Sequence, residues 1–401
     1  MPQQELYAEV VTDLRAAYRL AKKNKAGAGP CVRCMMELEE VFDGLARQII
    51  NGTYAPRPSV CFVVTNPVPR EIIAADFSDR IVHHYVFRYL DRWLERELID
   101  DCYSCRKGKG TAYGVDRLEH HIRACSQNYT RECWVLQLDI NGYFMNIDRW
   151  KLYVMAMELM SRIGRRRDGK GRRLDAKPKH RLIERLLATL ILHDPLSNCT
   201  VRDREGLLSL LPPSKSLRFS PEGCGLPIGN LTSQMFSNLY MNVFDQWVKR
   251  GLRVKHYGRY VDDSYYVSVD RERLLALVPK IDDFLQRELG LHLNLAKTKL
   301  TEARQGVSFL GVHLKPYRRY VKRRTMGRIR GQVSRMREVS QTELARDEVR
   351  QHLLSSANSF LGVLGHTASY KLRRELFGSY PMYVFAHGTR GMRKFELNDV
   401  R

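Results

Sequence analysis

The sequence predicts an α+β fold in which helices surround a small antiparallel sheet. Two short runs, residues 255–260 and 264–269, are rich in aromatic and β-branched residues and flank an acidic pair, Asp262 and Asp263. We expect them to form two antiparallel strands with the acidic pair at the connecting turn. A third run, residues 134–138, is mostly apolar and ends at Asp139, as a buried strand does when it delivers a side chain to a sheet edge.

The helices are predicted from apolar residues that recur at helical spacing. In the N-terminal part this pattern covers residues 5–25, 35–51 and 79–100, with a loop at 26–30 and strands at 60–64 and near residue 70. Further helices are predicted at 180–193 and 270–288, and residues 315–401 have a helical and basic pattern. Residues 162–179 are densely basic and contain three glycines, which favours a mobile loop or a nucleic-acid contact.

Length and charge narrow the class of protein. A chain of 401 residues can build two or three domains around sizeable cores. The formal net charge of +23 indicates a polyanionic partner, because neutralising phosphates releases counterions. A membrane surface is the competing explanation, but no apolar run approaches 18 residues and no basic amphipathic helix has a clean aromatic face. With no signal peptide at the N-terminus, we expect a cytoplasmic protein without a membrane partner.

Three aspartates are candidate metal ligands. Adjacent acidic residues are common in solvated turns, so Asp262 and Asp263 alone indicate little. Asp139 on a neighbouring strand changes this, because three carboxylates together could hold two Mg²⁺ ions for phosphoryl transfer.

Nine cysteines in a chain without an export signal are expected to be reduced. Two Cys-x-x-Cys pairs, Cys31/Cys34 and Cys102/Cys105, could alternatively form a four-thiolate zinc site.

Two motifs around the aspartates give a specific resemblance. Residues 136–144, Leu-Gln-Leu-Asp-Ile-Asn-Gly-Tyr-Phe, resemble the first catalytic motif of reverse transcriptases, and residues 260–263, Tyr-Val-Asp-Asp, resemble the third. The motifs occur in the order of that family. The resemblance implies a right-hand polymerase fold and catalytic roles for Asp139, Asp262 and Asp263, with Ile140 beside Asp139 in the metal site. It also implies that Lys297, rather than Lys299, protonates the leaving pyrophosphate.

A further stretch, residues 225–234, is similar to a narrower group. Most reverse transcriptases carry Gln between its Pro and Gly and end it with Ser-Pro, whereas this chain has Ile228 and Ser233-Gln234. With Pro-Pro-Ser-Lys-Ser-Leu at 212–217 and Tyr-Gly-Arg-Tyr at 257–260, the chain resembles the reverse transcriptases of diversity-generating retroelements over residues 60–315. In that family the segment lies beneath the nascent base pair. Because Ile228 replaces an amide there, and apolar pockets discriminate shapes by only about 1–3 kcal/mol, loose base selection is expected; its direction toward template adenines is implied by the family alone.

The resemblance also implies binding residues. Arg70 would contact the incoming triphosphate, the ring of Phe144 would exclude a 2′-hydroxyl, and the other nucleotide-binding candidates are Ile228, Gly229 and Gln234. Ordinary alternatives are an exposed strand arginine for Arg70 and a core ring for Phe144. The candidates for template and primer binding are Arg106, Lys107, Lys109, Tyr260, Phe309, Leu310, Gly311, Arg323, Arg324 and Arg328. For the basic ones the alternative is a solvated loop or helix face.

The predicted domains follow the same resemblance. Residues 1–135 would form the N-terminal part of the fingers, 136–148 the first palm strand, 149–222 an insertion with fingers and palm helices, 223–315 the palm with its catalytic hairpin and primer grip, and 316–401 a helical thumb. The expected function is RNA-directed DNA synthesis on a retroelement RNA, with adenine-directed errors, during mutagenic retrohoming. Expected partners are two Mg²⁺ ions, deoxynucleotides, template RNA, the RNA/cDNA duplex and an accessory variability protein. The alternatives are a retron-like or group II intron-like reverse transcriptase and an inactive RNA-binding scaffold.

Overall fold

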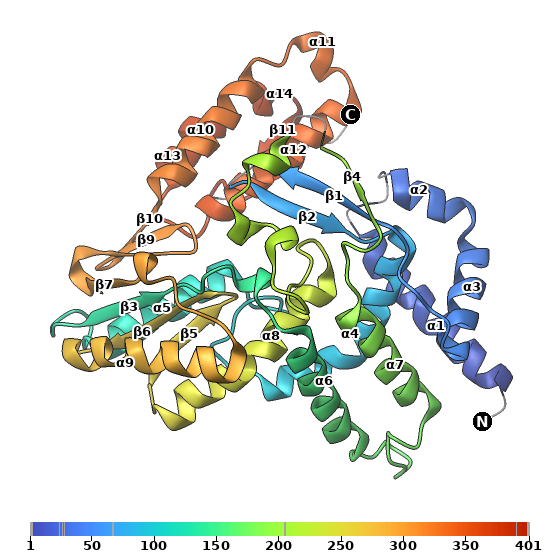
Figure 1. Ribbon diagram of the computed structural model, residues 1–401. Coiled ribbons are helices and arrows are strands. Elements are labelled where there is room, and N and C mark those ends of the chain that lie inside the picture. The colour runs from blue at the N-terminus through green and yellow to red at the C-terminus, as the bar shows by residue number, and fades with distance from the viewer. Residues whose placement is uncertain are drawn as a thin grey trace.

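The computed structural model describes residues 3–23, 25, 27, 29–65, 68–203, 206–389 and 391–398 (Figure 1). Helices account for most of these residues, and four small sheets lie among them. The predicted fold class, α+β, is confirmed.

The central sheet has the strand order β5-β6-β3-β7 and is antiparallel throughout. Its strands are β3 (Trp134–Leu138), β5 (His256–Tyr260), β6 (Asp263–Ser268) and β7 (Lys299–Glu302). Side chains alternate between two hydrophobic cores: Leu136 and Tyr266 join the larger core with the helices, and Val135 and Tyr265 join a second core with α5 (Thr111–Cys125). Both faces are therefore covered, which explains the mostly apolar strands.

The N-terminal helices differ in detail from the prediction. Helix α1 (Gln3–Lys22) ends before residue 25, and the single helix predicted at 35–51 is two helices, α2 (Gly29–Met36) and α3 (Leu38–Asn51). The loop predicted at 26–30 is wrong for residues 29 and 30, which belong to α2. Pro30 lies in the first turn of this helix, where its missing N–H costs no hydrogen bond. Residues 26 and 28 lie outside the described residues. The predicted end at Gly52 is confirmed, with a φ of 73°.

A second sheet, of order β2-β1-β4, carries the predicted strands at 60–64 and 70. Its strands are β1 (Ser59–Val64), β2 (Arg70–Ala74) and β4 (Cys199–Val201), and β4 runs parallel to β1. Helix α4 (Phe77–Glu97) follows β2 and starts two residues before the predicted position, because Asp76 caps it by accepting a hydrogen bond from the Ser78 N–H.

The basic insertion joins two helices. Helix α6 (Arg149–Gly164) packs beside α7 (Pro178–Leu192), which starts two residues earlier than predicted. Between them, where the sequence predicts a mobile loop or a nucleic-acid contact, residues 166–174 form a small hydrogen-bonded hairpin. Short 3-10 helices then occupy Leu207–Leu210, Pro213–Lys215 and Leu217–Phe219.

Two helices support the central sheet from the side of the larger core. Helix α8 (Leu231–Gln246) continues into a π-helical turn at Trp247–Gly251, and α9 (Arg271–Phe284) continues into another at Leu285–Leu289. Helix α9 and its π-helical turn replace the single helix predicted at 270–288. The helix begins after Asp270 because the Asp270 side chain caps it by accepting a hydrogen bond from the Arg273 N–H. A 3-10 turn at Leu295–Lys297 leads into β7, and another follows β7 at Ala303–Gln305.

The C-terminal part has its own hydrophobic core, seen at the top of Figure 1 in orange and red. It begins after a third sheet, β8 (Val307–Phe309), β9 (Val312–Lys315) and β10 (Arg318–Val321). Helices α10 (Arg323–Arg337), α11 (Gln341–Leu344), α12 (Asp347–Leu364), α13 (Tyr370–Phe377) and α14 (Met382–Phe385) follow, as the helical pattern predicts. The pair β11 (Ala386–Gly388) and β12 (Phe395–Leu397) was not expected. None of the helices in the described residues is long and apolar enough to cross a membrane.

Candidate active site

The three aspartates lie at one end of the central sheet. Asp139 directly follows β3, Asp263 begins β6, and Asp262 lies in the turn that precedes it. Because Leu138 pairs with Ser264, the end of β3 lies beside the start of β6. Strand pairing therefore brings together carboxylates that are more than 120 residues apart in the sequence.

The turn that carries Asp262 is strained. Tyr260 pairs with Asp263, so the loop has only two residues, and its first residue, Val261, has a φ of 58°. Such a loop normally has Gly at this position, since a β-branched residue with positive φ is sterically disfavoured. A conformation of this kind costs about 1–3 kcal/mol and persists only where the surroundings hold it.

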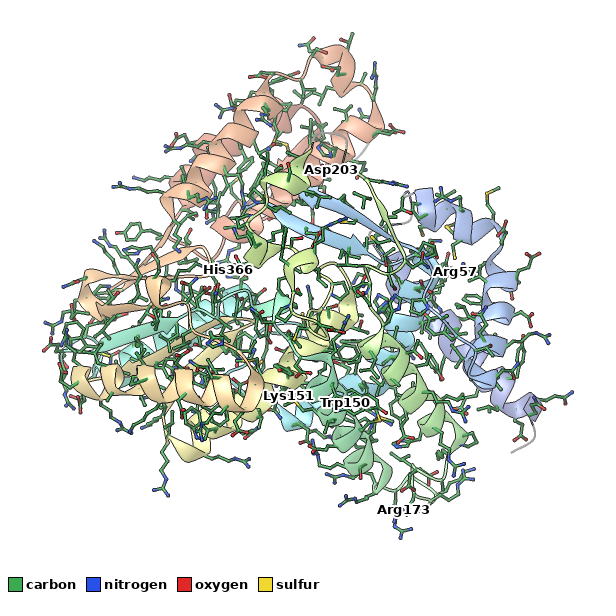
Figure 2. The ribbon with its side chains drawn as sticks, viewed as in Figure 1. Arg57, Trp150, Lys151, Arg173, Asp203 and His366 are labelled. Atoms are coloured by element: carbon green, nitrogen blue, oxygen red, sulfur yellow. The ribbon has the colours of Figure 1, made fainter. Side chains whose placement is uncertain are left out.

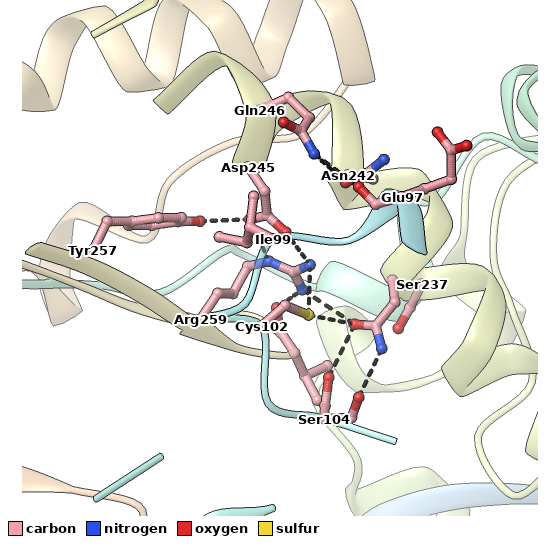
Figure 3. Close-up of polar contacts among 12 residues, drawn as sticks. Glu97, Ile99, Cys102, Ser104, Ser237, Asn242, Asp245, Gln246, Tyr257 and Arg259 are labelled. Atoms are coloured by element: carbon pink, nitrogen blue, oxygen red, sulfur yellow. Dashed lines mark hydrogen bonds and ion pairs between the residues drawn. The ribbon is translucent and has the colours of Figure 1, made fainter. Parts of the chain in front are cut away.

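A buried ion pair beneath the turn supplies that restraint (Figure 3). The side chains of Arg259 and Asp245 are both fully buried and joined by two hydrogen bonds of 2.8 and 2.6 Å. A third guanidinium nitrogen donates to the Val261 carbonyl at 2.8 Å, and Tyr257 donates to Asp245 at 2.6 Å. Burial alone would lower the pKa of Arg259, but the attraction of Asp245 outweighs it and keeps the guanidinium charged.

The sequence did not predict a role for Asp245, and it indicated Arg259 only as part of the Tyr-Gly-Arg-Tyr motif at 257–260. The available signal was a charged residue in the middle of an aromatic strand, because a buried arginine requires an acidic partner. The partner itself could not be found in this way, since Asp245 lies on α8, a separate element.

The carboxylates repel one another. Burial, followed by the negative charges of Asp262 and Asp139, raises the pKa of Asp263 to about 7 although this side chain reaches solvent. Burial and Asp139 also raise the pKa of Asp262, against the lowering effects of Lys297 and Arg70. Arg70, from β2, thus lies close enough for its charge to lower the pKa of Asp262.

Lys297 contacts Asp139 directly, with Nζ donating to Oδ2 at 2.8 Å. This hydrogen bond raises the pKa of Lys297. The backbone supports the same contact, because the Asn294 N–H donates to the Asp139 carbonyl at 2.8 Å and Ile140 bridges to Leu293. The segment with Lys297 is therefore fixed to the end of β3, and Lys297, rather than Lys299, is hydrogen-bonded to Asp139.

The donor set suits Mg²⁺ in kind. Burial and neighbouring negative charge raise the pKa values of Asp262 and Asp263, and a divalent cation bound to these hard oxygen ligands would offset that negative charge. Among the described residues, no three His, Cys, Asp or Glu side chains are yet arranged to hold a metal ion.

The predicted nucleotide-binding residues lie around β2. The Ile73 N–H donates to the Ile228 carbonyl at 3.0 Å, and Phe144 and Ile228 pack against one small apolar cluster. Gly229 has a φ of 129°, and a Cβ there would lie 3.0 Å from Ile72, so glycine permits the close approach of this segment to β2. Phe144, Ile228 and Gly229 thus lie beside β2, the strand that begins with Arg70.

The loop at 102–110 is hydrogen-bonded to the central sheet. Residues 101–103 lie beside β5 through hydrogen bonds with Arg259. Two of the predicted template contacts are used within the protein: Arg106 is buried and binds Glu95 at 2.6 and 2.7 Å, and Lys109 binds Asp100 at 2.8 Å. Lys107 is exposed, so it is the member of this group whose charge faces solvent.

Gln234 lies beside the second cysteine pair, Cys102 and Cys105. The Cys105 thiol donates to Gln234 Oε1 at 2.6 Å, and Cys102 is fully buried and donates to Asn238 at 3.4 Å. Cys31 and Cys34 lie elsewhere, on α2 against the N-terminal helices. Among the described residues, no group of three or more His, Cys, Asp or Glu side chains could hold a metal ion. The two cysteine pairs lie in separate parts of the fold.

The predicted primer grip is the hairpin of β8 and β9. Phe309 is buried against Tyr265, with ring centroids 5.2 Å apart, and Leu310 and Gly311 form the tip with φ values of 45° and 87°. Gln137 on β3 donates to the Ser308 carbonyl at 3.0 Å, which ties the hairpin to the strand before Asp139. Tyr260 packs against the same core.

Helix α10 begins two residues after β10, the strand that pairs with β9 of this hairpin. It carries six arginines and no acidic residue, and Arg323, Arg324 and Arg328 are exposed. The preceding residue, Lys322, donates its N–H to the Gly311 carbonyl at 3.0 Å, and its charge acts on Asp263. Lys322 is therefore a site residue that the sequence showed only as one member of a basic run.

Comparisons with known proteins agree with this geometry. Residues 187–314 match the family model described as "Reverse transcriptase (RNA-dependent DNA polymerase)". No curated protein matches the chain.

Among solved structures, the apo telomerase of Candida tropicalis is similar at 13% identity and a TM-score of 0.49, covering 80% of this chain and 56% of that one. The telomerase of Candida albicans with a fragment of telomeric RNA gives 11% and 0.48, covering 82% and 55%. This chain thus spans about half the length of those proteins.

The matched stretch contains Asp262, Asp263, Lys297 and the β8–β9 hairpin, while Asp139 precedes it in sequence. Asp139 nevertheless belongs to the same site, because β3 pairs with both β6 and β7. Residues 187–314 are thus similar to reverse transcriptases, and strand pairing places Asp139 beside the acidic pair of that stretch.

Proposed function

We propose that this protein is an RNA-directed DNA polymerase whose catalytic carboxylates are Asp139, Asp262 and Asp263. The observation that carries the proposal is their placement at one end of the central sheet, within a domain of that class. Asp139, Asp262 and Asp263, with the backbone of Ile140, would hold two Mg²⁺ ions, which when bound would stabilise charge on the attacking and leaving oxygens.

The surrounding side chains would position the substrates. Arg70 and Lys297 place positive charge beside the carboxylates, where a triphosphate would lie. Phe144 would contact the sugar, and the primer 3′-hydroxyl would attack the α-phosphate of a deoxynucleotide. Once Lys297 leaves Asp139, its ammonium group would donate a proton to the departing pyrophosphate.

The proposal extends to a diversity-generating retroelement. Its support is Ile228, an apolar residue beside Phe144 where other reverse transcriptases carry Gln, together with Ser233-Gln234. In this proposal the template is the retroelement's own RNA, the cDNA carries errors opposite adenines, and an accessory variability protein assembles with the enzyme. The predicted division into fingers, palm, insertion and thumb belongs to the same proposal and is supported by the separate core of the C-terminal helices.

The test is extension of a DNA primer on a defined RNA template, with and without the accessory protein, followed by sequencing of the cDNA. Errors concentrated opposite adenines would support both parts of the proposal. Uniformly accurate cDNA would remove the mutagenic part and favour a retron-like or group II intron-like enzyme. RNA binding without any cDNA would favour the inactive scaffold.

A further inference from the structure

We propose that the hairpin of residues 165–177, which we call the arginine hairpin, is a second RNA-binding surface that grips the phosphates of a base-paired RNA stem outside the catalytic cleft. The inference rests on the proposed function only for the identity of the polyanion as RNA. Four observations on the hairpin define the surface: its hydrogen-bonded order, its charge, its position and its lack of large exposed apolar side chains.

The arginine hairpin is preformed. Its two arms are joined by hydrogen bonds from the Leu174 N–H to the Arg166 carbonyl at 2.9 Å and from the Asp168 N–H to the Arg172 carbonyl at 2.8 Å. Asp168 also accepts from the N–H groups of Lys170 and Arg172 at the tip, and Lys177 binds its carboxylate at 2.7 Å. Leu174 is buried in the main core and anchors the hairpin. Binding would therefore cost little ordering entropy.

Its charge exceeds what its own acids can balance. Residues 165–177 contain seven cations and two carboxylates, Asp168 and Asp175. The two carboxylates are used by Arg172, Arg173 and Lys177. Arg165, Arg166 and Lys170 are exposed and have no carboxylate partner among the described residues. Clustered charge of one sign creates a field that attracts a polyanion.

The hairpin lies one helix length away from the nucleotide site. Helix α6 starts five residues after Phe144 and has 16 residues, so its far end is about 24 Å from its start. Figure 2 shows the two ends, with Trp150 and Lys151 near the middle of the molecule and Arg173 at the bottom. The thumb helices lie at the opposite end of the view. The hairpin therefore cannot contact the nucleotides that surround the three aspartates.

The surface chemistry fits a nucleic-acid stem better than a protein. A protein interface needs buried apolar or aromatic anchors, but the apolar residues of the hairpin are Leu174, which is buried, and Ala176. Single-stranded RNA is usually held by stacking on aromatic rings, and residues 165–177 contain none. Double-stranded RNA is recognised mainly through its backbone, for which exposed Arg and Lys are sufficient.

The test compares two triple variants of the full chain. Arg165→Gln/Arg166→Gln/Lys170→Gln removes the three unpaired charges of the hairpin. The matched control, Arg250→Gln/Arg273→Gln/Lys280→Gln, removes the same charge from exposed positions on other helices. The probes are a short primer–template duplex and the same duplex with an added RNA stem. Circular dichroism and thermal unfolding establish that both variants fold.

For the stem-bearing probe, the hairpin variant should bind at least about tenfold more weakly at low salt, and the slope of log K against log salt should be shallower by about 2–3. Binding and extension of the short duplex should change less than twofold. An equal loss in the control variant, or an equal loss for the short duplex, would overturn the inference. Because binding is measured without nucleotides, a wild-type protein that never extends primers would refute the polymerase proposal and leave this result interpretable.

Discussion

The buried pair of Arg259 and Asp245 offers the sharpest test of how the fold positions the catalytic turn. Arg259→Met would leave the Asp245 carboxylate fully buried, with Tyr257 as its main remaining partner. Breaking a buried ion pair from one side costs about 3–5 kcal/mol, a large share of a stability of about 5–15 kcal/mol. The variant should therefore unfold at a much lower urea concentration.

A second variant separates stability from positioning. In Tyr257→Phe/Asp245→Leu/Arg259→Met, all three polar members of the set are removed together, so the pair leaves no buried charge behind. Replacing a buried ion pair by apolar residues is often neutral, so most of the lost stability should return. The Val261 carbonyl would still lack the donor that now lies 2.8 Å away, and the strained turn would be free to relax.

Primer extension gives the decisive reading. A displacement of about 1 Å at a catalytic group can reduce the rate by about 10²-fold, and we expect kcat to fall by this order in both variants. Recovery of stability without recovery of kcat would establish Arg259 as a positioning residue. If kcat returned together with stability in the triple variant, the ion pair would serve folding alone and the reasoning would be refuted.

Four further predictions address the site itself. Asp262→Asn with Asp263→Asn should abolish nucleotide incorporation in a primer-extension assay while RNA binding persists; undiminished activity would contradict the metal assignment. The pKa of Asp263 is about 7 in the folded chain against an ordinary 3.8, so the folded state binds the extra proton between these values. In EDTA, the contribution of this group to stability is therefore present at low pH and lost as the pH rises from about 4 through 7, and thermal unfolding should show that Asp263→Asn flattens this dependence. An equally steep dependence in the variant would assign the titration to another group. Ile228→Gln should lower misincorporation opposite template adenines, as measured by sequencing the cDNA. An unchanged error spectrum would show that residue 228 does not cause the errors. Phe144→Ala should increase ribonucleotide incorporation relative to deoxynucleotides, because it opens space beneath the sugar. An unchanged ratio of ribonucleotide to deoxynucleotide incorporation would show that Phe144 only packs in the core.

Local sequence patterns predicted the elements that matter most for the site. The strands that end at Asp139 and flank Asp262 follow from runs of β-branched and aromatic residues, and their pairing was confirmed. The helix boundaries were less certain because they depend on capping contacts such as that of Asp76, which move a start by a turn or less. The hairpin at 166–174 was missed because its order comes from Asp168, a single acidic residue in a basic run.

The roles of charged side chains were the main point that the sequence could not settle. Arg106 and Lys107 are adjacent and equally basic, yet Arg106 is buried against Glu95 while Lys107 is exposed. Long side chains can turn either way, and the choice depends on which acceptors neighbouring elements supply. The same holds for Lys297, whose partner Asp139 lies 158 residues away in sequence.

The sequence by itself determined the composition of the site: its three aspartates, the strands that carry them, the basic surfaces and the apolar residue at 228. These depend on local periodicity and residue chemistry, which a single chain displays directly. Only the tertiary structure decided which charges are paired and buried. It shows that Arg259 is hydrogen-bonded to the turn before Asp262, that the charge of Lys322 acts on Asp263 and that Arg165, Arg166 and Lys170 are exposed. The physical reason is that burial and pairing are set by contacts between elements distant in sequence, and these contacts determine whether a charge stabilises the fold or is free to bind a ligand.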